Sequence, residues 1–463
     1  MITITVTTPC LRVSGGHWIC ALLAIIPLTA GAKGLLHADP EAQVLRADVA
    51  VPAATSFSTT DYATGNWWGV RDEMKEKGIE FVPTYTTEPA ANIDGGEKSG
   101  STYIHNIDLD LKLDLNKLFG IPRTTFLMKV SQRSGTSLSE RKIAPSEGGN
   151  QFTVQEAYGP DQQVRLINVQ FNTTFLDERL DLAYGRLAAN DDFLRSPLYC
   201  QFINNSFCGS PQAVFLQNPF AFSAYPTAAW GTRARYNTTS GSWTFQGAVY
   251  DADPNLTDGD PDNTGNNDHG TDMSLGDNGV TLAGEVHYHV NRGSTTALPG
   301  VYKIGGFYMN GDYQDLGKTD NSTVDGNAMF WLLADQALYR ETPGSDQGLA
   351  VFGALIFSLE DKVNTLDNYF AAGLLYRGLF DARPKDTTGL GITTGWFSDE
   401  INKARRTEDE EDKDYEAVIE LNHKFQFSRG IAITPDIQYV IRPAGTGDID
   451  NALVIGFRGT VQF

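Results

Sequence analysis

Side chains that could do chemistry occur in two small groups of the sequence. Asp191 and Asp192 are adjacent carboxylates, and His287 and His289 stand two residues apart beside Glu285. Glycoside hydrolases use pairs of carboxylates, but the acid and the base must be placed around a substrate, which adjacency in the chain does not provide. The histidine pair has no further evident ligand to complete a metal site. Because no nucleophile motif or phosphate-binding loop is present either, the sequence predicts neither an enzyme nor a cofactor.

An acidic stretch, residues 251–277, is also open to a metal-binding interpretation. Its alternating aspartates from Asp258 to Asp262 resemble the start of a calcium loop. Asn263, however, stands where glycine is needed, and His269 stands where the bidentate glutamate belongs. We expect a solvated loop, with weak divalent binding near lipopolysaccharide as the alternative.

Composition excludes several classes of protein. The 463 residues carry 36 Lys and Arg against 57 Asp and Glu, a net charge of -21, so no basic surface for nucleic acid is expected. After the first thirty or so residues, no apolar run reaches the roughly 18 residues of a membrane-spanning helix. A membrane β-barrel is still compatible with the composition, because its strands alternate polar and apolar residues.

The N-terminus has the pattern of a secretory signal peptide. Arg12 precedes the apolar stretch 18–30, and Ala30-Gly31-Ala32 is a small-residue cleavage site. We therefore expect residues 1–32 to be a leader. Residues 33–78 would then form a periplasmic tether with a short amphipathic helix over Trp67–Lys77.

Removal of the leader would leave Cys200 and Cys208 as the only cysteines. In an oxidising compartment these two are expected to form a disulfide that closes a short loop. The alternative is two free thiols.

From Ile79 onward the chain alternates apolar with polar or small residues, in runs separated by turn residues. In the last run, Leu453, Ile455 and Phe457 share one face, whereas Arg458 and Thr460 share the other. A soluble β-sandwich could bury one such face. Charged residues recur on the polar face along the whole chain, however, and this favours a closed barrel with a wet lumen.

The turns delimit about sixteen strands, an even number as in bacterial outer-membrane barrels. Their expected starts are Ile79, Tyr103, Thr124, Val164, Glu178, Thr227, Ser242, Gly279, Pro299, Asn327, Gln347, Asn368, Thr388, Asp414, Gly430 and Asn451. Short turns alternate with long loops, the longest over 190–226, as expected for periplasmic turns and external loops. The predicted fold is an all-β, 16-stranded antiparallel transmembrane barrel over residues 79–463.

Several segments carry a resemblance to a known family. They are WWGVRDEMKEKGIEF from Trp67, LAYGRLAANDDFLRSPLYCQF from Leu182, AAWGTRARY from Ala228, GAVYDADP from Gly247, and ITPDIQYVIRP with NALVIGFRGTVQF at the aromatic C-terminus. By these segments the chain resembles the carbohydrate-selective porins of the OprB type. The resemblance implies a monomeric barrel that passes glucose and related sugars passively across the Gram-negative outer membrane, narrowed by external loops.

The longest loop contains the best candidates for contact with a sugar, which needs paired donors and acceptors and an aromatic surface. It opens with Asn190, Asp191, Asp192 and Phe193, continues through Tyr199, and is braced by the cysteine pair. We expect this loop to form the constriction. The alternative is that the two aspartates merely end a strand.

Alternation also assigns charged residues to the lumen. If Trp230 and Tyr236 face lipid, Arg233 and Arg235 face the lumen, whereas Arg186 is ambiguous because a bulge at Gly185 would change its side. The expected lumen charges are of both signs: Lys129, Arg133, Arg233, Arg235, Lys424 and Arg458 against Asp108, Asp110, Glu285, Glu416, Glu420 and Asp436. Such a mixture suits a neutral polyol, although any water-filled barrel has a lining of this kind.

The sequence therefore predicts a sugar-conducting channel surrounded by outer-membrane lipid and lipopolysaccharide. A general or ion-selective porin is the nearest alternative. A secreted all-β sugar-binding protein or hydrolase is the alternative from another class.

Overall fold

The computed structural model describes residues 10–12, 18–20, 62–157, 164–208, 223–253, 255–256, 267–294 and 296–463. Two short strands, β1 (Cys10–Arg12) and β2 (Trp18–Cys20), pair antiparallel within a small unit, Met1–Gln43. Most of the expected leader and of the tether lies outside the described residues, as do Asp258 to Asn263 of the calcium-like stretch.

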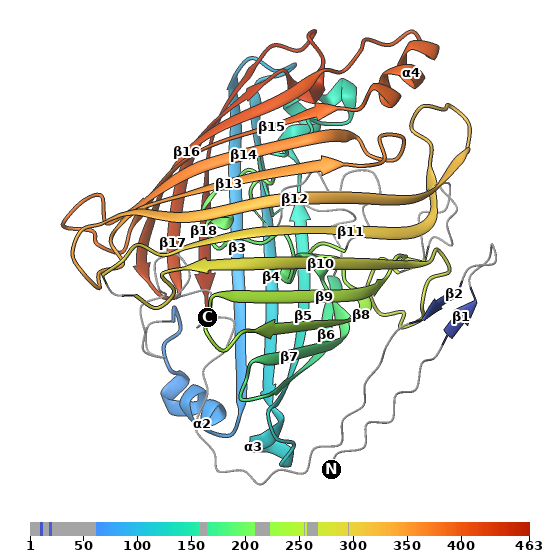
Figure 1. Cartoon of the computed structure of the whole chain (residues 1–463). Helices are drawn as coiled ribbons and strands as arrows, with labels where there is room; N and C mark the ends of the chain where they lie inside the picture. The colour runs from blue at the N-terminus through green and yellow to red at the C-terminus, as the bar shows by residue number, and fades with distance from the viewer. Residues whose placement is uncertain are drawn as a thin grey trace. The chain divides into compact units, whose positions relative to one another are not determined.

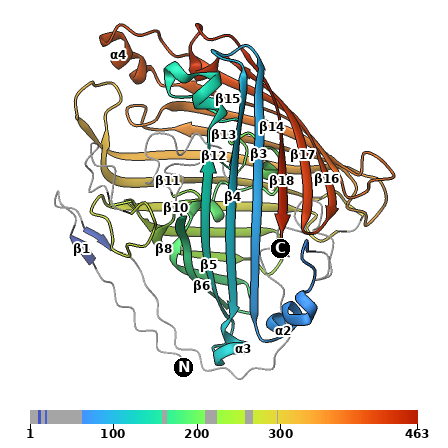
Figure 2. The same ribbon diagram turned by 180° about the vertical axis from the view of Figure 1, so that it is seen from behind.

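The rest of the described chain is a closed barrel of sixteen strands (Figures 1 and 2). Each strand pairs antiparallel with its neighbours in sequence, and β18 pairs with β3 to close the wall. The strands are β3 (Ile79–Asp94), β4 (Gly100–Asp114), β5 (Thr124–Gly135), β6 (Val164–Phe175), β7 (Leu180–Leu187), β8 (Ala229–Asn237), β9 (Trp243–Asp251), β10 (Val280–Val290), β11 (Gly300–Gln314), β12 (Thr323–Arg340), β13 (Gly348–Ser358), β14 (Leu366–Arg377), β15 (Thr387–Phe397), β16 (Tyr415–Ser428), β17 (Ile431–Ile441) and β18 (Ala452–Gln462). The predicted fold and strand number are confirmed.

The predicted strand starts agree with the structure, with the largest difference at β12, which was expected from Asn327 and begins at Thr323. The alternation of loop lengths is less strict than predicted. Three connections at the end that carries the long loops are short, residues 95–99, 315–322 and 359–365.

The two faces of the wall differ as the alternation predicted. Outward side chains are apolar and exposed, as with Leu109, Phe245 and Ile304. Inward side chains are mostly buried; many are polar or charged, as with Arg233 and Glu420, and others are apolar, as with Phe352 and Trp331. An apolar belt around a polar lumen is the arrangement that a lipid bilayer requires of a barrel.

Helices are few and lie outside the wall strands. The expected helix over Trp67–Lys77 is present as a 3-10 turn, η2 (Trp67–Gly69), followed by α2 (Val70–Glu76). The structure also contains short turns: η3 (Ser139–Ile143), η4 (Pro145–Glu147), η6 (Ala189–Asp191), η7 (Tyr199–Gln201) and η9 (Pro443–Gly445). Within the described ranges, none of the helices has the length and apolarity to cross a membrane.

Two further helices, α3 (Leu115–Phe119) and α4 (Asp399–Thr407), were missed by the sequence analysis. Both are capped at their N-termini, α3 by the Asp114 carboxylate and α4 by the Ser398 hydroxyl. Acidic residues in the first turn of α4 and basic residues in its last turn oppose the helix dipole favourably. These signals were present in the sequence, but both helices lie in segments expected to be turns or loops.

The seam between β18 and β3 is held from outside the sheet by Arg71 of α2. Its Nη2 donates to the terminal Phe463 carbonyl oxygen at 2.6 Å, and its Nη1 lies 3.5 Å from the Phe81 carbonyl oxygen of β3. The guanidinium stacks on Tyr62 at 4.0 Å and on Trp67 at 4.1 Å. The segment before the first strand thus joins the two strands that close the barrel.

We expect Arg71→Met to lower the temperature at which the folded barrel unfolds in detergent. The substitution removes hydrogen bonds from a charged group, each about 1.5–3 kcal/mol, and cation–π contacts of about 0.5–2 kcal/mol. The shift of the heat-modifiable band on semi-native gels measures the change, with the exposed Lys75→Met as the control. Equal midpoints for the two variants would contradict the role of Arg71 at the seam.

Candidate functional site

The connection from β7 to β8, residues 188–228, enters the barrel, and we call it the lumen loop; its residues 209–222 lie outside the described ranges. The two ends of the loop are joined where it leaves the wall. Asn190 N donates to the Ser223 carbonyl oxygen at 3.2 Å, and Tyr225 N donates to Asn190 Oδ1 at 3.1 Å. The outgoing and returning arms of the loop are therefore hydrogen-bonded to each other where the loop enters the lumen; we call this point the neck.

Aromatic side chains of the lumen loop pack against small residues of the far wall. Phe202 and Phe207 are buried, with ring centroids 4.6 Å apart. A Cβ atom added at Gly391 of β15 would lie 2.8 Å from Phe202 and 3.0 Å from Phe207, closer than real Cβ contacts. Glycine at this inward position lets the loop lie directly on the sheet.

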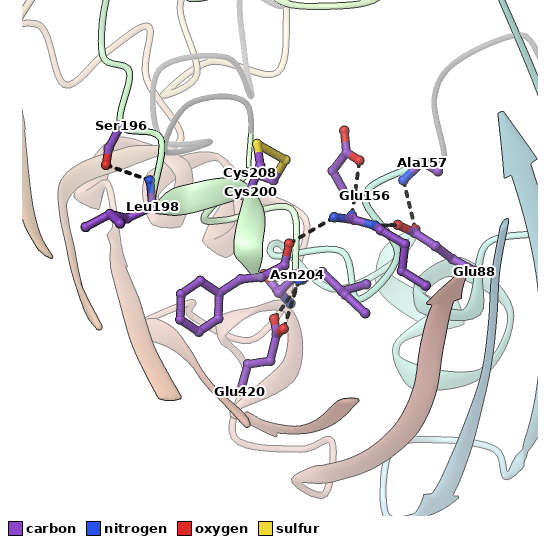
Figure 3. Close-up of a disulfide and its surroundings, with 12 residues drawn as sticks. Glu88, Glu156, Ala157, Ser196, Leu198, Cys200, Asn204, Cys208 and Glu420 are labelled. Carbon is purple, nitrogen blue, oxygen red and sulfur yellow. Dashed lines mark hydrogen bonds and ion pairs between the residues drawn. A yellow bond between two sulfur atoms is a disulfide. The ribbon is translucent and has the colours of Figure 1, made fainter. Parts of the chain in front are cut away.

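A buried carboxylate holds the same part of the loop by its backbone (Figure 3). Glu420 of β16 accepts hydrogen bonds from Ile203 N and Asn204 N, both at 2.8 Å. The Asn204 side-chain amide donates to Gln438 Oε1 of β17 at 2.9 Å. Two neighbouring strands thus bind one turn of the loop through polar groups as well as through packing.

The connection from β5 to β6, described to residue 157 and called here the companion loop, is held in the same way. Glu416 of β16 accepts from Asn150 Nδ2, Gln151 N and Phe152 N at 2.7–2.9 Å, and from Ala444 N at 2.6 Å. Its carboxylate is completely buried. One side chain therefore orders two separate connections.

Arg458 of β18 joins both loops to the wall (Figure 3). Its Nε donates to Glu88 of β3 at 2.5 Å, its Nη2 to Glu156 of the companion loop at 3.2 Å, and its Nη1 to the Phe202 carbonyl oxygen at 3.2 Å. Glu88 in turn accepts from Ala157 N at 2.9 Å. Arg458, a candidate for the solute path, is thus a structural centre with 12% of its side chain exposed.

The predicted candidates Asp192, Arg233 and Arg235 are brought together. One oxygen of Asp192 lies 2.9 Å from Arg233 Nε and 2.9 Å from Arg235 Nη2. Arg233 also contacts Asp181 of β7. These ion pairs fix the start of the lumen loop to β7 and β8.

Glu285 of β10, also a candidate, binds the same part of the lumen loop, and we call Asp192, Arg233, Arg235 and Glu285 together the bracket. It accepts from Leu194 N at 3.3 Å, from Trp331 Nε1 at 2.7 Å and from Gln246 Nε2 at 2.9 Å, and it contacts His287 at 2.6 Å. The Nε2 atom of His287 is therefore engaged by the Glu285 carboxylate. No group of His, Cys, Asp and Glu in the described ranges is arranged to hold a metal.

Phe193 and Tyr199, two predicted aromatic candidates, are buried in the core. Phe193 lies edge-on to Tyr250, and Tyr199 lies edge-on to Phe352. Cys200 and Cys208 form the predicted disulfide, which bridges eight residues at the tip of the described part of the loop (Figure 3). These groups shape the loop itself.

Arg186 lies apart from the bracket. Its Nε donates to the Ala228 carbonyl oxygen at 3.0 Å, and its Nη1 donates to the Gly270 carbonyl oxygen. It shares strand parity with Tyr184, which is exposed on the outer face, yet it is buried because the external segment around Gly270 covers it. The ambiguity in the sequence thus has a tertiary cause.

Tyr225, which the sequence analysis missed, attaches the return arm of the lumen loop to β4 and β5. Its hydroxyl contacts Asp108, Asn106 Nδ2 at 2.9 Å and Ser131 at 2.7 Å. The Arg133 guanidinium lies 4.7 Å from its ring. Burial raises the pKa of Tyr225 and outweighs the lowering by Arg133, with Asp108 raising it further, so the hydroxyl stays protonated.

Half-exposed polar groups lie beside this attachment. Lys129 Nζ is 3.6 Å from Asp110 Oδ1, and their side chains are 25% and 37% exposed. Asp191 lies near Lys129 and is partly exposed. These side chains are more exposed than those of Asp192 and Arg233, which are 6% and 3% exposed.

The loops also bind one another away from the lumen wall. Glu147 forms a bidentate pair with Arg405 of α4 at 3.0 and 3.1 Å, and Lys413 Nζ lies 2.8 Å away. Burial alone would raise the pKa of Glu147, but the hydrogen bonds and charges of Arg405 and Lys413 outweigh it and lower the pKa. The companion loop is thereby tied to the connection between β15 and β16.

A closed sixteen-stranded barrel that is apolar outside, charged inside and partly filled by its own loops has the architecture of an outer-membrane porin. The family model described as "Carbohydrate-selective porin, OprB family" matches residues 98–463. The chain belongs to this family, and its location is the Gram-negative outer membrane.

Individual relatives agree with this assignment. "Porin B" of Pseudomonas aeruginosa is 31% identical over 438 residues, which cover 88% of this chain and 93% of the relative. "Putative porin QuiX" of Acinetobacter baylyi is 27% identical over 433 residues, which cover 89% of this chain and 95% of the relative. The high-pH structure of Pseudomonas putida OprB is 27% identical, with a TM-score of 0.78 over 88% of this chain and 99% of that chain.

We expect Glu420→Ala to loosen the lumen loop. The change leaves the Ile203 and Asn204 N–H groups without their acceptor, at a cost of about 1–3 kcal/mol for each buried donor. Single-channel recording in planar bilayers should show a larger and noisier open current than for wild type. Glu410→Gln, at an exposed carboxylate on another loop, is the control, and an unchanged current in Glu420→Ala would contradict the role of Glu420.

The pair formed by Glu147 predicts an acid-sensitive contact. Because its folded pKa is depressed, the contribution to stability is present above the ordinary glutamate pKa of about 4.3 and is lost as pH falls through the lower folded value. The protection of the amides of residues 399–413 against hydrogen exchange, taken relative to their intrinsic exchange rate at each pH, should fall on acidification in the wild type. Glu147→Gln should show the low protection already at neutral pH; protection equal to that of the wild type would refute the link.

Proposed function

We propose that this porin conducts carbohydrates passively and that the lumen loop forms its constriction. The observation that carries the proposal is that one loop leaves the wall at β7 and β8 and packs against β15 and β16, half-way around the barrel. Phe202 and its neighbours bind this far side, whereas Tyr225 binds β4 and β5, closer to the origin of the loop. A loop fixed in this way crosses the lumen and narrows it.

The charges beside the loop suit a neutral, hydroxyl-rich solute. Lys129 supplies donors, and Asp110 and Asp191 supply acceptors, all partly exposed near one another. Asp192 and Arg233 are paired with each other, and Arg458 is paired with Glu88 and Glu156. The free part of the lumen therefore offers hydrogen bonds without a strong field of one sign, which favours sugars over a dedicated ion pathway.

The bracket of Asp192, Arg233, Arg235 and Glu285 supports a positioning role for these predicted candidates. They hold the loop in the lumen, whereas Asn190 and Asp191 at the neck are nearer to the half-exposed groups. We assign direct contact with the solute to the Lys129 side of the pore. Arg458 and the bracket set the width of the pore by holding the loops in place. Substitution of Arg458 or of a bracket residue should therefore change the conductance for all solutes alike.

Two further expectations belong to this proposal. The apolar stretch 18–30 and the small residues after it support export through a cleaved leader, residues 1–32. The continuous apolar outer face supports a monomer. A general porin remains the alternative, and solute discrimination separates the two.

Swelling of liposomes that contain the purified protein tests the proposal. Glucose should enter faster than a disaccharide and faster than a charged solute of similar size. Equal rates for all three solutes would make the protein a general porin, and no swelling with correctly inserted protein would exclude a channel.

We expect Tyr225→Phe to speed disaccharide entry more than glucose entry. Loss of the hydroxyl removes the contacts with Asp108, Asn106 and Ser131 while the ring is retained. Tyr288→Phe, on the outer face of β10, is the matched control. If both variants kept the wild-type ratio of rates, Tyr225 would not set the width of the pore.

A further inference from the structure

Two adjacent tryptophans before the first wall strand point in different directions. Trp67, Trp68 and Gly69 all have positive φ, at 48°, 56° and 97°, which is an unfavourable run for two bulky residues. Trp67 turns inward, where its ring covers Arg71 and its Nε1 donates to Thr64 Oγ1 at 2.8 Å. Trp68 is fully exposed, at 103%. The strained turn thus presents one large amphipathic side chain to the surroundings.

The base that carries Trp68 is firmly attached to the barrel. Ala63 N donates to the Gln462 carbonyl oxygen at 2.9 Å, and Arg71 binds the Phe463 carbonyl oxygen. The segment lies at the end of the wall that has the short β16–β17 turn (Figures 1 and 2). Short turns mark the periplasmic end of an outer-membrane barrel. Trp68 is therefore presented at the periplasmic rim on a fixed support.

The support packs on the lower end of β3. A small cavity under α2 is lined by Ile79, Glu80 and Phe81 of β3 together with Tyr62, Trp67 and Met74. Ile79 and Phe81 share the strand parity of Tyr85, whose hydroxyl meets that of Tyr103 on the outward face, whereas Glu80 has the parity of the buried Glu88. The segment thus adjoins the lipid-facing surface of the barrel at its lower edge.

A second element extends this surface. α3 follows β4 at the same end, and its Lys117 Nζ donates to the Lys75 carbonyl oxygen of α2 at 3.2 Å. Phe119 and Ile121 are exposed beside it, and Val70 of α2 is also exposed. The two helices and the residue after α2 carry charges of both signs, with Lys75, Lys77 and Lys117 against Asp72, Glu73 and Glu76.

We propose that α2 and α3 form a foot on the inner leaflet of the outer membrane, with Trp68 in the interfacial region of the phospholipids. Tryptophan favours this region because its ring is apolar and its N–H is polar. Ammonium groups of Lys75 and Lys117 are of the sign that binds lipid phosphate. The occupant of this exposed surface is thus phospholipid, as on the adjoining wall, and the foot fixes the depth of the barrel whatever solute it conducts.

Tryptophan quenching in reconstituted vesicles tests the foot. The full protein is placed in phosphatidylcholine brominated either near the headgroup end of the acyl chain or near its methyl end. The emission of Trp68 is the difference between wild type and Trp68→Phe. Trp243→Phe on the outer face and Trp331→Phe in the lumen calibrate quenched and unquenched positions.

The expected result is that bromine near the headgroup end quenches the emission of Trp68 more than bromine near the methyl end does. Quenching by aqueous acrylamide without quenching by either lipid would place Trp68 in the periplasm and overturn the proposal. Shielding from both kinds of quencher would mean that a second copy or the preceding part of the chain covers it, which also overturns the proposal.

Discussion

Peptide groups inside a barrel need hydrogen-bond partners, and this constraint determines how the lumen is organised. The backbone of the wall strands is already paired in the sheet, so the peptide groups of loops that enter the lumen bond to one another, as Asn205 N does to the Thr153 carbonyl oxygen, or to side chains. Glu416, Glu420, Glu88 and Glu285 meet this need by accepting from backbone N–H groups of the two loops. A carboxylate is well suited because it accepts several bonds at once. Removal of any one of them leaves donors in the protein interior.

The interior is divided into two parts with different chemistry. The inward faces of β13–β15 carry glycine, alanine and aromatic residues, against which Phe202 and Phe207 pack. The inward faces of β4 and β5 carry Asp108, Asp110 and Lys129 and remain partly accessible. The loops therefore pack on the apolar side of the interior, and on the other side the Tyr225 attachment leaves Asp108, Asp110 and Lys129 partly accessible.

Much of the fold follows from local patterns in the sequence. Alternation with a period of two residues fixes which side of a strand faces lipid, so the inward position of Arg233 and Arg235 could be predicted without knowledge of any partner. The partners themselves could not be predicted. Asn150 and Glu416 are 266 residues apart, and nothing in either segment indicates that they meet. For the same reason, the contacts of Arg458 with both loops could not be predicted, although its inward position could. For Arg186, strand parity alone predicts an exposed outward side chain, and the sequence does not show that the external segment around Gly270 covers it.

The contacts of Arg71 with β3 and with the terminal Phe463 have a consequence for the order of steps in barrel assembly. The guanidinium and the terminal Phe463 carbonyl oxygen are 392 residues apart, so their contact spans almost the whole barrel sequence. The acceptor is in place only when the last strand has found the first, since Phe463 N also donates to the Pro83 carbonyl oxygen of β3. The segment ahead of the wall is made first but can dock only at the end. The segment can therefore dock only on a closed barrel, because in an unclosed sheet the Phe463 carbonyl oxygen does not lie beside β3.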